Sequence, residues 1–237
     1  MSAFRNPGRV VGLWYVGLLL FGPLTLIYIP NKLFVHGDAG ATAANIAAHQ
    51  QLFKIGMLAD VVGSIILIFL VLAFYRLFKD VDQYWAVFLV IPGGIMPAVL
   101  QLVNFVNDAG ALLVAQEPSF LNVFDKPQRD ALVLLFVQLG ESQITAAEIL
   151  WGAWLFPMGI LTYKSGFLPR FIGVWLLING IAYVVLCASR IMLPGTADKL
   201  FLYLQPALFG ELVMMFWLLI RGATPPAQGK PRYESVP

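Results

Sequence analysis

The chain has 237 residues, of which 59% are hydrophobic, 14% are aromatic and only 12% are charged. A soluble domain carries about 25% charged residues, and a single water-facing globule cannot bury this much apolar surface. The composition therefore excludes a soluble protein and predicts an integral membrane protein. The formal net charge of +2 comes from residues spread over short loops, and it gives no support for nucleic-acid binding.

Six apolar stretches are long enough to cross a bilayer as helices, which takes about 20 residues each. We expect the spans at about 10–29, 55–77, 85–106, 131–161, 171–187 and 200–220. They predict an all-α polytopic membrane protein with one six-helix transmembrane domain over residues 1–222. The proline-rich, polar segment 223–237 is expected to be a disordered cytoplasmic tail.

The distribution of basic residues predicts the orientation of the bundle. With a cytoplasmic N-terminus, nine Lys and Arg residues fall on the cytoplasmic side and six on the opposite side. Basic residues also stand close to each helix end on the cytoplasmic side. Both termini are therefore predicted to be cytoplasmic.

Three local signals lie between or inside the spans. The alanine-rich segment 42–51 has no helix breaker, so it predicts a helix that leads into the second span. Segment 107–129 mixes acidic and aromatic residues, and we expect a partly ordered lid or interfacial segment there. The stretch IPGGIMP, 91–97, combines two prolines with two glycines and predicts a kink in the third span.

Polar residues in the third and fourth spans form two stripes. At 100° per residue, the stripe of the fourth span falls within an arc of about 80° and comprises Gln138, Glu141, Thr145, Glu148 and Gly152. The stripe of the third span comprises Gly93, Pro97, Gln101, Asn104 and Asp108. Because lipid cannot solvate polar groups, the two stripes should face each other or a common cavity.

The other spans add isolated polar residues, namely Asp60, Asn179, Gln205 and Glu211. Their depths, counted from the loop ends, indicate a pocket that opens outward. Only Arg190 and Lys54 are placed to pair with the acids, so some carboxylates should be protonated, share protons or bind a cation. The candidate ligand-binding residues are Glu141, Glu148, Glu211, Asp60, Gln101, Asn104, Gln138, Asn179 and Arg190. The alternative is that these residues only join helices to one another.

The sequence limits the cofactors and metals that such a site could hold. His36 and His49 are the only histidines, and both lie in the first outer loop, which excludes a three-histidine zinc site and a haem ligated by two histidines inside the bundle. A carboxylate site with His49 and Glu141 is the weak candidate for a metal. The single cysteine, Cys187, excludes an internal disulfide. No cofactor is predicted, and no catalytic residue is assigned.

Two stretches of the sequence resemble a known family. The stretch EILWGAWLFPMGILTYKSGFLPRFIGVWLLINGIAY (148–183) and the stretch GELVMMFWLLIRG (210–222) are similar to the bacterial integral-membrane domain-of-unknown-function family 4386. The resemblance implies a bacterial inner-membrane protein with six or seven helices. It brings no activity, cofactor or catalytic residue. Both acids of these stretches, Glu148 and Glu211, already belong to the candidate site.

Three classes of function remain open at this point. A binding or transport protein would accept a cation, a proton-coupled solute or an amphipathic small molecule, although the chain has no internal repeat of the transporter type. An accessory or structural subunit would use its polar residues for helix packing alone. A membrane enzyme would act on a lipid by carboxylate acid/base chemistry. The expected partners are the lipid bilayer and a ligand in the bundle, and a homo-oligomer or a larger complex remains open.

Overall fold

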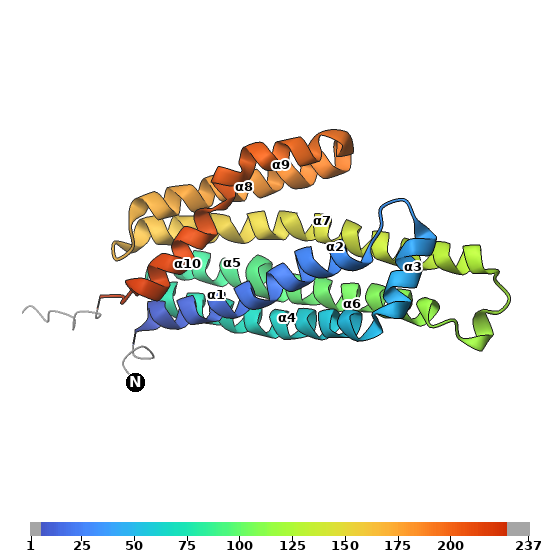
Figure 1. The fold of residues 1–237 in the computed structure, drawn as a ribbon. Coiled ribbons are helices and arrows are strands. Elements are labelled where there is room, and N and C mark those ends of the chain that lie inside the picture. Colours follow the sequence, from blue (N-terminus) through green and yellow to red (C-terminus); the bar gives the residue numbers. More distant parts are fainter. Residues whose placement is uncertain (1–5, 227–237) are drawn as a thin grey trace, which may run out of the picture.

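The computed structural model describes residues 6–226, and the elements that it contains there are helices (Figure 1). The first half of the chain forms α1 (Pro7–Pro23), the π-helical segment η2 (Leu24–Tyr28), α2 (Ile29–Leu33), α3 (Ala39–Ala48), α4 (Gln50–Phe78), α5 (Gln83–Val90) and the π-helical segment η3 (Ile91–Ile95). The second half forms α6 (Met96–Ala115), the short 3-10 helix η4 (Ser119–Leu121), α7 (Lys126–Ser165), α8 (Arg170–Met192), α9 (Pro194–Leu208) and α10 (Gly210–Ile220). The all-α class is confirmed.

Six long apolar helices are confirmed as candidate membrane spans. They cover Pro7–Leu33, Gln50–Phe78, Gln83–Ala115, Lys126–Ser165, Arg170–Met192 and Gly195–Ile220. Each is longer than the stretch that apolarity alone predicts, because backbone hydrogen bonding continues the helix into flanking residues that are not apolar. At the start of α7, for example, Asp125 and Gln128 form a reciprocal capping box. The expected tail from residue 223 onward lies mostly outside the described residues.

The structure also shows what the local signals between and inside the spans form. Most of the alanine-rich segment lies in α3, which ends at Ala48, and the single residue His49 separates it from α4. Much of segment 107–129 is helical, because α6 continues to Ala115. The proline and glycine stretch of the third span adopts the π-helical turn η3, which joins α5 to α6. A second π-helical turn, η2, follows Pro23 in the first span, where no irregularity is predicted.

The bundle has two ends with different contents (Figure 1). The end that carries residue 6 also carries the turns between α4 and α5 and between α7 and α8. The opposite end carries α3 and the hairpin between α6 and α7. The 40-residue α7 runs between these ends and packs along both α6 and α8. The hairpin of α8 and α9 lies along one side of the bundle.

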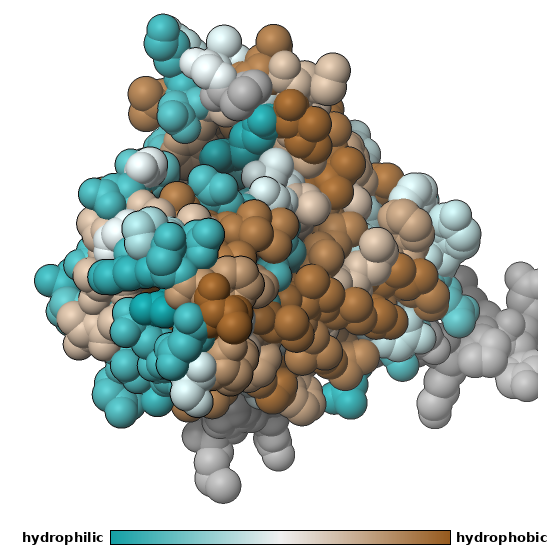
Figure 2. Space-filling model, turned by 90° about the vertical axis from the view of Figure 1, so that its right-hand side faces the viewer, coloured by the Kyte–Doolittle hydropathy of each residue, from teal (hydrophilic) through white to brown (hydrophobic). Residues whose placement is uncertain are grey.

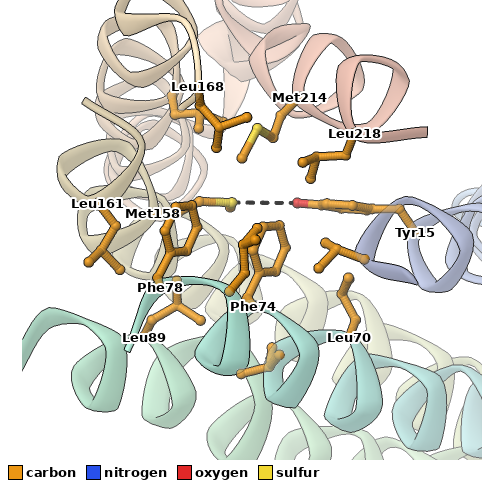
Figure 3. Packing of buried hydrophobic residues seen from close by; sticks show 14 of the residues in the cluster. Tyr15, Leu70, Phe74, Phe78, Leu89, Met158, Leu161, Leu168, Met214 and Leu218 are labelled. Carbon is orange, nitrogen blue, oxygen red and sulfur yellow. Dashed lines mark hydrogen bonds between the residues drawn. The ribbon is translucent and has the colours of Figure 1, made fainter. Parts of the chain in front are cut away.

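Two separate apolar clusters hold the bundle together. The larger one lies near residue 6 and includes Tyr15, Phe74, Phe78, Met158 and Leu218. Figure 3 shows these side chains converging from α1, α4, α7 and α10, with the Tyr15 hydroxyl oxygen 3.7 Å from the Met158 sulfur. The smaller cluster lies near α3 and includes Leu33, Ile46, Phe53 and Val133. Along α4 and α7, the polar residues of the spans stand between these two clusters.

Helices α7 and α8 approach each other through paired glycines. A Cβ atom on Gly173 would lie 2.7 Å from the carbonyl oxygen of Gly159, and one on Gly152 would lie 2.8 Å from the carbonyl oxygen of Gly180. Only residues without side chains allow two helix backbones to come this close. Gly152, the last member of the polar stripe of the fourth span, therefore serves helix packing.

An ion pair joins α7 to the start of α5 at the end of the bundle near residue 6. The Lys164 ammonium lies 2.8 Å from Asp82 Oδ2, and Asp82 Oδ1 caps α5 by accepting from the Trp85 amide. The hydrogen bond from Lys164, together with this cap, lowers the pKa of Asp82 below its usual value. Because the folded-state pKa is lowered, the stabilisation is complete above the unfolded-state pKa of about 3.9 and is lost as the pH falls through the folded-state pKa.

We therefore expect the unfolding temperature of the wild-type protein to fall as the pH is lowered from about 5 to below 4. The Asp82→Asn variant should show a smaller fall, since it has no carboxylate to protonate at this position. Lys164→Gln should reduce the same acid dependence from the other side of the pair. Thermal unfolding across this pH range measures both. An unchanged acid dependence in Asp82→Asn would show that the pair contributes nothing.

Candidate functional site

A polar cavity of about 690 Å³ lies between the two apolar clusters. Its walls come from η2, α2, α4, α6, α7, α8 and α9. His36 and Asp198, which both line it, are exposed. His36 belongs to the loop between α2 and α3, at the end of the bundle that carries α3 (Figure 1). Figure 2 views the molecule from this end and shows hydrophilic residues gathered beside a broad hydrophobic area.

Both predicted stripes contribute to this cavity. The fourth span supplies Gln138, Glu141, Thr145 and Glu148, and the third span supplies Gln101, Asn104 and Asp108. Asp60 from α4 and Arg190 from α8 also line it. Seven of the nine candidate ligand-binding residues therefore surround one space. They are Glu141, Glu148, Asp60, Gln101, Asn104, Gln138 and Arg190.

Glu148 and Arg190 form an ion pair at the wall of the cavity. Arg190 Nε donates to Glu148 Oε1 at 3.0 Å and joins α8 to α7. Glu148 is only 6% exposed, and its second oxygen, Oε2, is buried without a hydrogen-bond partner in the described part of the chain. The pair therefore satisfies one carboxylate oxygen and leaves the acceptor capacity of the other unused among the described residues.

Asn104 and Asp108 form a second polar group on the opposite wall. Asn104 Nδ2 donates to Asp108 Oδ2 at 3.2 Å, while the buried Asn104 Oδ1 has no partner among the described residues. That oxygen points toward α7, where a Cβ atom on Gly140 would lie 2.9 Å from it. Asp60 is close enough to Asp108 for their charges to interact. Glu141 is exposed, and its carboxylate has no partner in the part of the chain that the structure describes.

A second, smaller space adjoins the polar cavity. We call it the aromatic chamber; its volume is about 310 Å³, and its aromatic lining residues are Tyr15, Phe21, Trp151, Trp154 and Tyr183. Glu211 lines it and accepts a hydrogen bond from the Tyr15 hydroxyl at 3.4 Å. The two spaces share several lining residues, including Asp60, Gln101 and Trp151. Glu211 is thus placed beside the polar cavity and not in its lining.

Asn179 does not line either space. It is fully buried, and its Nδ2 donates at 3.2 Å to the carbonyl oxygen of Leu208, the last residue of α9. That carbonyl stands where the helix stops before α10 begins, so it has no amide four residues further on in the same helix. The structure therefore gives Asn179 a role in holding the break between α9 and α10. Gln205 lines neither space.

The candidate metal site with His49 and Glu141 does not form within the described residues. One ring nitrogen of His49 lies 3.0 Å from the Asn45 carbonyl, and His49 does not line the polar cavity, whereas Glu141 does. Between residues 6 and 226 there is no group of three or more His, Cys, Asp or Glu side chains arranged to hold a metal ion.

Several lining residues are not predicted by the sequence pattern. Thr25 and Gln143 lie off the two stripes, and Tyr15 and Tyr183 resemble ordinary core aromatics in the sequence. Asp198 precedes the last predicted span, yet it forms part of α9. One signal for an aromatic lining is present in the sequence. Trp151 and Trp154 follow Glu148, a member of the polar stripe, within the next two turns of the fourth span.

The fold and the site define a multi-pass helical membrane protein with six long apolar helices and internal polar space. The chain belongs to the family described as "Domain of unknown function (DUF4386)", whose model matches residues 10–222. An uncharacterised protein of Archaeoglobus fulgidus is 34% identical over 74 residues, which are 31% of this chain and 43% of that relative. The chain thus matches less than half the length of this relative, which comes from an archaeon. No solved structure matches the chain.

Proposed function

We propose that this protein binds a small cationic or amphipathic molecule in the polar cavity and carries it through the membrane. The observation that supports the proposal most strongly is the charge of the lining. Five acidic residues line the cavity, Asp60, Asp108, Glu141, Glu148 and Asp198, and Arg190 is the one arginine or lysine among the described lining residues. Arg190 is already paired with Glu148. The remaining carboxylates favour a cation or protons.

The size and the buried polar atoms also favour a ligand. The volume of about 690 Å³ lies within the range of about 300–1,000 Å³ that is typical of small-molecule sites. Buried oxygens without partners, such as Glu148 Oε2 and Asn104 Oδ1, are rare in a packing interface because each costs about 1–3 kcal/mol. A hydrogen-bond donor that enters the site would offset part of this cost.

The two π-helical turns support movement of a ligand. Thr25 and Leu26 of η2 line both spaces, and Pro92 and Gly93 of η3 line the aromatic chamber. π-Helical turns are found frequently at functional sites, where they weaken the regular hydrogen bonding of a helix. They put two adaptable segments in the walls of the internal space, as alternating access of a transporter would require.

The proposed location is the inner membrane with both termini in the cytoplasm, so that the polar cavity opens away from the cytoplasm. The excess of basic residues at the end near residue 6 supports this orientation. His36→Cys and Ser235→Cys, each made in a Cys187→Ser background, should react with an impermeant thiol reagent from opposite sides of the membrane. Labelling of both positions from the same side would contradict the orientation.

The binding proposal can be tested by thermal unfolding of the purified full-length protein with three groups of compounds: inorganic cations, organic ammonium ions and neutral amphiphiles. A ligand at 100 times its Kd stabilises the protein by about 2.7 kcal/mol. We expect a cationic compound to raise the unfolding temperature of the wild-type protein and of Glu117→Gln, an exposed acid outside both spaces. Glu141→Gln should lose the effect. Equal shifts in Glu141→Gln and the wild type would place the bound compound outside the polar cavity and contradict the proposal. No shift with any of the three groups would also contradict it and would favour the accessory-subunit alternative.

A further inference from the structure

The aromatic chamber has a lining that differs from that of the polar cavity. Five aromatic side chains surround it, and two pairs of rings come together there. The ring centroids of Trp151 and Tyr183 are 5.8 Å apart, and those of Tyr15 and Trp154 are 6.2 Å apart. These four residues belong to three helices, α1, α7 and α8. The chamber therefore forms only when the three helices pack together.

The chamber also holds acidic charge without basic charge. Glu211 and Asp60 line it, and no Arg, Lys or His is present among its described lining residues. The Tyr15 hydroxyl, at 3.4 Å from Glu211 Oε1, is a neutral donor and does not balance the charge of a carboxylate. A carboxylate without a counter-charge inside a membrane protein is costly, and a cationic ligand would supply that charge.

The chemistry of the walls selects the kind of cation. Ca²⁺ and Mg²⁺ take six or more oxygen ligands, which the mainly apolar lining of the chamber does not offer, and the described residues hold no group of three His, Cys, Asp or Glu side chains for another metal ion. Aromatic faces attract alkylammonium and quaternary ammonium groups, whose charge is spread over weakly hydrated carbon atoms. The volume of about 310 Å³ is sufficient for one small ammonium group with its substituents.

From these features we infer that the aromatic chamber is a binding site for an organic ammonium group, with Glu211 as its counter-charge and the rings of Trp151 and Tyr183 as its walls. The inference rests on the proposed function, whose ligand it specifies as an organic amine or quaternary ammonium ion. The ligand reaches the chamber from the polar cavity, with which the chamber shares Asp60, Gln101 and Trp151. Polar substituents of the ligand remain in the polar cavity, near Glu141 and Asn104.

The test compares two probes of the same shape, choline and 3,3-dimethyl-1-butanol, in which carbon replaces the charged nitrogen. Binding to the detergent-purified full-length protein is measured by isothermal titration calorimetry. We expect the wild-type protein to bind choline at least about tenfold more tightly than the alcohol. Glu211→Gln should weaken choline binding by about thirtyfold or more, because a buried charge loses its partner. Glu117→Gln, made outside both spaces, should bind choline as the wild type does.

A second variant keeps the test independent of the fold of Glu211→Gln. Tyr183→Leu retains both acids of the chamber and removes one aromatic face, and it should weaken choline binding by about two- to thirtyfold. The inference is overturned if the wild type does not bind choline, if it binds the alcohol equally well, or if neither Glu211→Gln nor Tyr183→Leu changes the choline affinity. Choline binding that is lost in Glu141→Gln but unchanged in Glu211→Gln would overturn the chamber and leave the polar cavity as the site.

Discussion

The Gly173→Val variant is expected to lose about 3 kcal/mol or more of its free energy of unfolding. A Cβ atom at this position would lie 2.7 Å from the Gly159 carbonyl oxygen and 2.8 Å from the Tyr163 amide nitrogen. Both atoms belong to the backbone of α7, so relief of the overlap requires that α7 and α8 move apart. Forcing extra atoms into a packed interface typically costs about 1–3 kcal/mol, and more when backbone has to move. Unfolding in denaturant, followed by circular dichroism, measures the loss.

A matched glycine in another membrane span provides the control for this variant. No atom lies within 4 Å of the place where a Cβ on Gly63 would stand. The Gly63→Ala variant should therefore be neutral, or more stable by up to about 1 kcal/mol, because alanine favours a helix more than glycine does. Gly173→Ala should still be destabilised despite the same gain in helix propensity. If Gly173→Val were as stable as the wild type, the close contact between α7 and α8 would be wrong.

The Arg190→Met variant is expected to lose about 1–3 kcal/mol of stability. It removes the cation from Glu148, whose side chain is only 8% exposed. Removal of one partner from a fully buried pair costs about 3–5 kcal/mol, but the Arg190 side chain is 34% exposed and solvent weakens the interaction. Glu148→Gln should be milder, because its amide oxygen can still accept from Arg190 Nε.

A double-mutant cycle separates the ion pair from other effects of these residues. The double variant Glu148→Leu/Arg190→Met should be more stable than Arg190→Met alone, since it leaves no unpaired carboxylate at this position. Chemical unfolding of the wild type, of Glu148→Leu, of Arg190→Met and of the double variant gives the coupling energy. Losses that simply add up in the double variant would indicate that Glu148 and Arg190 do not interact.

The membrane spans could be predicted from the sequence because an uninterrupted apolar run of about 20 residues is rarely anything but a membrane helix. The ends of the helices could not, because caps such as Asp125 act outside the apolar stretch and extend α7 by five residues before position 131. The sequence offered Arg190 and Lys54 as partners for the intramembrane acids, but it did not assign either cation to a particular acid. The packing of α7 against α8 brings Arg190 to Glu148.

The polar stripes could be predicted because helical periodicity fixes which residues share a face. Periodicity does not reveal which face a neighbouring helix covers. Asn179 resembles the cavity residues in the sequence, yet it donates to the Leu208 carbonyl at the break before α10. The aromatic chamber could not be predicted for the same reason. Tyr15, Trp151 and Tyr183 come from three helices, and their convergence depends on tertiary packing.

Native mass spectrometry of the detergent-purified wild-type protein tests most directly whether the internal polar space is a ligand site. We expect part of the protein to retain a small, non-lipid adduct whose fragment ions identify an organic cation. The adduct should be retained by Glu117→Gln and lost by Glu141→Gln and Glu211→Gln. Wild-type protein that carries no adduct, or only phospholipid bound equally by all four proteins, would contradict a ligand site and leave helix packing as the role of these polar residues.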